Sequence, residues 1–68
     1  MTRRELEVMG LVAAGASNQQ IAERLFISKP TAIRHVANIF AKLGARNRAE
    51  AVRIASELGL LGRVVPVE

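Results

Sequence analysis

The chain has 68 residues and a net charge of +4, half of its residues are hydrophobic, and it contains no cysteine. This length suits one small domain, and the absence of cysteine excludes disulfides and thiolate zinc sites as sources of stability. We therefore expect a single domain over residues 1–68 that is stabilised by helix packing, with no metal, cofactor or small-molecule ligand. No apolar run reaches the roughly 18 residues of a membrane-spanning helix, and no secretory signal is present, so we expect a cytoplasmic protein without a membrane partner.

Capping signals divide the chain into four segments. The N-terminal signals are Thr2-Arg3-Arg4-Glu5, Ser17-Asn18-Gln19-Gln20, Ser28 before Lys29-Pro30, and Asn47-Arg48-Ala49-Glu50. The first two have the form of a capping box, and proline is tolerated in the first turn of a helix. The matching stop signals are Gly15, Gly44 and Gly59. These signals predict an all-α fold with helices at about 3–14, 18–25, 29–43 and 48–58, and we expect a flexible tail over 62–68.

The second helix and the segment after it predict a helix-turn-helix. Ile21, Ala22 and Leu25 give residues 18–25 one apolar side, and only Phe26-Ile27-Ser28 separates them from the next helix. Two helices joined by three or four residues cross steeply, which is the geometry of this motif. The turn contains no glycine.

The third helix has two different faces. Ala32, Val36, Ile39 and Leu43 share one apolar stripe, which predicts the side that packs on the core. The opposite side consists of Pro30, Ile33, Arg34, Ala37, Asn38 and Ala41. A solvated face would be richer in glutamate and lysine, whereas small residues around one long cation allow close approach to another surface. We expect His35, beside the core stripe, to be buried or half-buried with a structural role.

The fourth helix is predicted to pack on the core through Val52, Ala55 and Leu58. The positive charge lies before it: residues 17–48 include six basic residues and one acidic residue, while the two flanks together sum to −1. Concentrated positive charge is what a phosphate-facing surface needs, because released counterions drive binding.

The chain resembles the LuxR-type (GerE-like) DNA-binding domain over roughly residues 2–61. The resemblance rests on several motifs in the same order and spacing: Thr2-Arg3-Arg4-Glu5, Val8 to Gly15, Ser17 to Ser28, Thr31, His35-Val36, and Lys42 to Arg48. It implies sequence-specific binding of double-stranded DNA in transcription regulation, with the helix at 29–43 in the major groove. It also implies a longer regulator that forms a homodimer through the helix at 48–58.

The resemblance and the helical faces together assign candidate site residues. We expect base contacts from Arg34, Ile33 and Ala37. An arginine can bond guanine O6 and N7 at once, and Ile33 can either meet a thymine methyl group or extend the core stripe. We expect phosphate contacts from residues at the helix starts and in the basic cluster: Gln19, Ser28, Lys29, Thr31, Lys42, Arg46 and Arg48.

Two positions depart from the family pattern. Pro30 and Ile33 stand where the family often has lysines that touch DNA. This departure motivates an alternative hypothesis, a protein-interaction or dimerisation module in which DNA binding is weakened or lost. An enzyme is not expected, because the sequence offers no nucleophile–base pair, metal set or phosphate-binding loop.

Overall fold

The computed structural model describes residues 1–60 and confirms the predicted all-α class. Its helices are α1 (Arg3–Ala13), α2 (Asn18–Leu25), α3 (Lys29–Leu43) and α4 (Arg48–Glu57), and the described residues include no strand. Helices α1 and α4 each end one residue earlier than predicted, because Ala14 and Leu58 are their C-caps. The tail predicted over 62–68 lies outside the described residues.

Each helix begins at the cap that the sequence predicts. The Thr2 hydroxyl accepts the Glu5 N–H at 3.1 Å, and the Glu5 carboxylate accepts the Thr2 N–H at 2.9 Å. Ser17 and Gln20 form the same reciprocal pair at the start of α2, at 3.1 and 2.8 Å. Ser28 and Asn47 cap α3 and α4 through single side-chain acceptors. These bonds satisfy backbone donors that the helices themselves leave without partners.

The described helices also end alike, with a left-handed residue just past the last turn. After α1, α3 and α4 that residue is Gly15, Gly44 or Gly59, whereas after α2 it is Phe26, at φ 57° and ψ 45°. Phenylalanine is rare in this conformation, which favours glycine. The side chain of Phe26 does not compensate for this strain, because the residue is 94% exposed. The turn after α2 therefore has the left-handed conformation that ends the other helices, but with phenylalanine in place of glycine.

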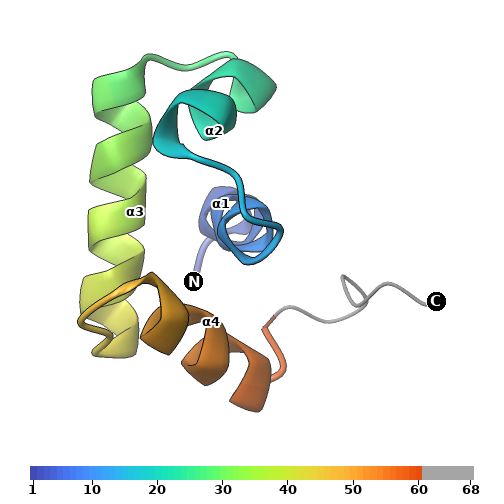
Figure 1. The fold of residues 1–68 in the computed structure, drawn as a ribbon, viewed down its shortest axis with the longest axis vertical. Helices are drawn as coiled ribbons and strands as arrows, with labels where there is room; N and C mark the ends of the chain where they lie inside the picture. Colours follow the sequence, from blue (N-terminus) through green and yellow to red (C-terminus); the bar gives the residue numbers. More distant parts are fainter. Residues whose placement is uncertain (61–68) are drawn as a thin grey trace, which may run out of the picture.

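The helices surround one small core (Figure 1). Helix α3 runs along one side of the domain, α2 lies at its first end and α4 at its last end, and α1 passes between them, seen end-on. The fully buried side chains come from all four helices: Val8, Met9, Val12, Ile21, Ala22, Ala32, Ile39, Ala51 and Ala55. Burying a side chain such as Met9 or Ile39 contributes roughly 1.5–3 kcal/mol relative to leaving it exposed.

One core assignment in α4 is wrong. Leu58, predicted to pack inward, is 64% exposed, while Ala55 is buried as predicted and Val52 packs against the core's edge. The buried position that the prediction missed is Ala51. Leu58 is the C-cap of α4 and its N–H still bonds the Ile54 carbonyl oxygen at 3.0 Å, so its side chain is exposed at the end of the helix although the helical register is kept. Among residues 1–60, no helix combines the length and hydropathy needed to cross a bilayer.

Candidate nucleic-acid interface

The outward face of α3 is the surface predicted to meet a nucleic acid. All of its predicted members are exposed: Pro30, Ile33, Arg34, Ala37, Asn38 and Ala41. Ile33 is 45% exposed and lies outside the core cluster, so it does not extend the core stripe. Three of these side chains are small, which leaves Arg34 as the long cation of the face. The core stripe on the opposite side is confirmed, since Ala32 and Ile39 are fully buried.

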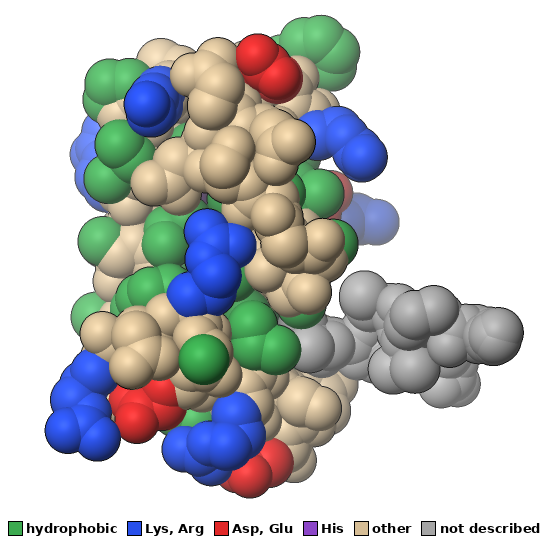
Figure 2. All heavy atoms as spheres, viewed as in Figure 1, with side chains coloured by type: hydrophobic (Ala, Val, Ile, Leu, Met, Phe, Trp, Pro, Cys, Tyr) green, Lys and Arg blue, Asp and Glu red, His purple; other side chains and the backbone are tan. Residues whose placement is uncertain are grey.

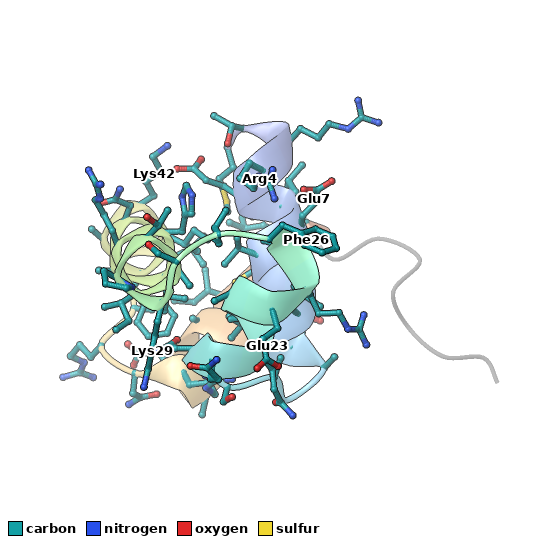
Figure 3. The ribbon with its side chains drawn as sticks, turned by 90° about the horizontal axis from the view of Figure 1, so that it is seen from above. Arg4, Glu7, Glu23, Phe26, Lys29 and Lys42 are labelled. Carbon is teal, nitrogen blue, oxygen red and sulfur yellow. The ribbon has the colours of Figure 1, made fainter. Side chains whose placement is uncertain are left out.

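The two lysines of α3 lie on its flanks. Figure 3 shows Lys29 and Lys42 on opposite sides of the helix when the domain is seen from above. In the view of Figure 2, hydrophobic and basic side chains line the edge over α3, while the prominent acidic side chains lie over α2 and α4. The exposed face of α3 therefore lies between two cations, one of which, Lys42, lies 2.9 Å from the carboxylate of Glu5.

The first turn of α3 has few free backbone donors. The Ser28 hydroxyl accepts the Thr31 N–H at 3.2 Å and donates to Thr31 Oγ1 at 2.8 Å. Pro30 has no N–H, so within the described residues the N–H groups of Ser28 and Lys29 are the donors at the start of α3 without a protein acceptor. Ser28, Lys29 and Thr31 thus lie together, as predicted, with Lys29 as the charged member. Neither Lys29 nor Arg34 forms an ion pair within residues 1–60.

The predicted contact on α2 is Gln19, at the second position of that helix. Its Nε2 donates to Glu23 Oε2 at 3.0 Å, and both side chains are exposed. Gln20 is used in the capping box of α2 instead. Both glutamines are exposed, and each uses one side-chain group in a hydrogen bond at the surface of α2.

The basic cluster at and after the C-terminal end of α3 forms hydrogen bonds within the protein, and its members are Lys42, Arg46 and Arg48. Lys42 Nζ lies 2.9 Å from each carboxylate oxygen of Glu5 in α1. Arg46, in the loop before α4, bonds the Glu50 carboxylate through its backbone N–H at 2.8 Å and its guanidinium at 3.3 Å. Each of these two basic residues changes the pKa of the carboxyl group that it bonds. The hydrogen bond from Lys42 and the Thr2 N–H lower the pKa of Glu5, and the backbone N–H and guanidinium of Arg46 lower the pKa of Glu50.

Arg48 joins the start of α4 to the connection between α1 and α2. Its Nη1 donates to the carbonyl oxygen of Ala16 at 2.9 Å and to that of Val12 at 3.3 Å. These carbonyls lie at and after the end of α1, and that of Val12 also accepts the Gly15 N–H at 3.0 Å. Arg48 therefore links three elements of the fold, a role that the sequence did not reveal because the partners are more than thirty residues away.

His35 is half-buried, in line with the structural role predicted for it. Within residues 1–60, no group of three or more His, Cys, Asp or Glu side chains is placed to hold a metal ion. A shallow hollow of about 510 Å³ lies between the end of α1 and α2, where it is lined by Leu11, Gln20 and Arg24 among others. It is separate from the α3 face.

The three-residue turn between α2 and α3 and the exposed α3 face define this chain as a helix-turn-helix domain. The model of the bacterial regulatory proteins of the luxR family matches residues 1–55. The chain therefore belongs to the LuxR family, whose members are transcriptional regulators rather than enzymes. The resemblance seen in the sequence is confirmed.

Curated relatives are similar over most of this chain. The HTH-type transcriptional regulator MalT of Vibrio cholerae and that of Serratia proteamaculans are each 43% identical to it over 58 residues, 85% of the chain. The uncharacterized transcriptional regulatory protein YhcZ of Bacillus subtilis is 42% identical over 64 residues, 94% of the chain. The match spans 6% of the length of each MalT protein and 30% of YhcZ.

Proposed function

We propose that this domain binds double-stranded DNA sequence-specifically in transcription regulation, with the exposed face of α3 in the major groove. The observation that supports this most is the composition of that face, where small residues surround Arg34 between two flanking lysines. An α-helix with its side chains is about 10–12 Å across, which matches a major groove of roughly 12 Å. Small side chains at positions 37 and 41 let the helix axis approach the bases.

The proposed base contacts follow from this docking. Arg34 is the candidate for bidentate bonding to guanine O6 and N7, because it is exposed and unpaired within residues 1–60. Ile33, 45% exposed, offers an apolar surface to a thymine methyl group. Ala37 permits van der Waals contact with base edges.

The proposed phosphate contacts divide into two groups. Lys29, Ser28 and Thr31 lie at the positive N-terminal end of α3, and Gln19 lies at the start of α2, the helix that crosses the backbone in this architecture. Lys42, Arg46 and Arg48 form the second group, and their contacts with phosphate must compete with the protein groups that they already bond. The first group therefore contributes most of the electrostatic attraction.

We further propose that the working unit is a cytoplasmic homodimer formed through α4 when the domain is part of a longer protein. Leu58 is exposed at the end of α4, and Ile54 is half-buried one turn earlier. Together they form a small apolar surface away from the α3 face. A dimer of this kind binds two half-sites about one helical turn apart.

The test is selection of binding sites from a random duplex pool by the purified chain, followed by affinity titrations on the selected and a shuffled duplex at several salt concentrations. We expect enrichment of a defined sequence. With two cationic phosphate contacts per protomer, the log–log salt slope is about −2 for a bound monomer and about −4 for a bound dimer. Ala37→Glu places a negative charge on the α3 face and should abolish binding, while the matched Ser56→Glu, on the exposed side of α4, should bind DNA with little change.

Absence of enrichment together with affinity that does not depend on salt would overturn this proposal. That result would favour the alternative, in which the same four helices dock onto another protein.

A further inference from the structure

The ion pair between Lys42 and Glu5 differs from the other ion pairs of the described residues. The Glu5 side chain is 10% exposed, whereas the glutamate side chains of the other three pairs, Glu50, Glu7 and Glu57, are 21%, 50% and 63% exposed. It also joins two helices across 37 positions of sequence, while the others join residues three or four apart. Within residues 1–60, Glu5 is the sole charged residue that is buried.

Burial makes Glu5 dependent on its cation. A carboxylate removed from water is strongly destabilised when its partner leaves, because neither water nor another cation replaces the lost interaction. Both oxygens of Glu5 accept from Lys42 Nζ at 2.9 Å, and one of them also accepts the Thr2 N–H. An ammonium has three N–H donors, so two of the three on Lys42 are used inside the protein.

The position of Lys42 connects this ion pair to DNA binding. Lys42 lies on the flank of α3 opposite Lys29 (Figure 3), and a helix in the major groove has a phosphate backbone on each side. Lys29 has no carboxylate partner within residues 1–60. The two flanks of one helix therefore differ: one offers a full positive charge, and the other offers a charge that Glu5 already balances.

We infer that Glu5 is an internal competitor of DNA phosphate for the Lys42 ammonium, and that it thereby limits the DNA affinity of the domain. The inference rests on the proposed function, since it assigns a regulator of the same interface. Glu5 acts through Lys42 and touches no DNA itself, so it is a positioning residue. Because the pair has no net charge, Lys42 contributes little to counterion release while the pair is intact.

The decisive variant is Glu5→Gln. A glutamine at this position keeps the capping box, because the second capping box of this chain uses Gln20 with a Ser17 N–H to Gln20 Oε1 distance of 2.8 Å. The substitution removes the negative charge and leaves Lys42 free. We expect the affinity for a selected duplex to rise about fivefold, and the log–log salt slope to steepen by about 0.9 per protomer.

Four further variants identify the cause. Glu7→Gln makes the same charge change on α1, on the side that Figure 3 shows turned away from α3, and should change affinity less than twofold. Lys42→Met alone should lower affinity by clearly less than Lys29→Met, which should lower it about fivefold. The double variant Glu5→Gln with Lys42→Met should lose the whole gain of Glu5→Gln.

Several results would overturn the inference. These are an unchanged or lower affinity for a folded Glu5→Gln, a gain that persists without Lys42, and a loss for Lys42→Met as large as that for Lys29→Met. The last comparison does not depend on Glu5→Gln being folded, and circular dichroism on each variant checks the fold. If the wild-type chain shows no salt-dependent duplex binding, the proposed function itself fails, which is distinguishable from wild-type binding that is insensitive to Glu5.

Discussion

The two ends of α3 present their cations in opposite ways. Near the N-terminal end, Lys29 and Arg34 are exposed and form no ion pair within residues 1–60. At and beyond the C-terminal end, Lys42, Arg46 and Arg48 all bond groups of the protein. A count of basic residues gives two for the first region and three for the second. The difference shows that such a count overstates the charge offered to phosphate, since part of it stabilises the fold.

The largest effect that tests this contrast is expected at Arg34. Its replacement by alanine removes a free cation from the middle of the α3 face, which should lower affinity for the selected duplex by about 1–3 kcal/mol, roughly 5- to 150-fold. Affinity for a shuffled duplex should fall much less, and urea unfolding should be unchanged. The measurement is a pair of titrations on the two duplexes. An equal loss on both would remove Arg34 from base readout.

A smaller effect, on the free energy of unfolding, is expected beyond the C-terminal end of α3. Arg48→Met removes the hydrogen bonds to the carbonyls of Val12 and Ala16, which should lower the free energy of unfolding by about 1–2 kcal/mol in urea denaturation. The control is Arg46→Met, because the Arg46 side chain is 87% exposed in its pair and such pairs contribute little. If both variants unfold alike, Arg48 does not brace the fold as described.

The smallest effect is expected in the pH dependence of the free energy of unfolding. The pKa values of Glu5 and Glu50 are lowered from 4.5 in the folded chain, by Lys42 and Arg46 respectively. Their contribution to stability is therefore full above pH 4.5 and is lost as the pH falls through the lowered values. Urea unfolding should show this loss. Glu5→Gln should flatten the curve, while Lys29→Met should leave it unchanged, because no carboxylate pairs with Lys29 within residues 1–60.

Much of the fold follows from local signals. The caps at Thr2, Ser17, Ser28 and Asn47 fix the helix starts because each side chain bonds a backbone N–H three residues ahead. The exposed face of α3 follows from helical periodicity. The partner of Lys42 could not be predicted in this way, because Glu5 had an evident local role in the capping box and its second partner is 37 positions away. The exposure of Leu58 was not predicted, because periodicity gives the face on which a residue lies but not how far along the helix the core extends.

The exposed turn between α2 and α3 has a practical use. Phe26 already holds its left-handed conformation with 94% of its surface in solvent, so its side chain can be exchanged with little effect on packing. Since the chain has no cysteine, Phe26→Cys would supply a single thiol for a fluorescent dye. The dye would lie three residues before the start of α3, at a fixed point from which movement or occupancy of that helix can be followed in solution.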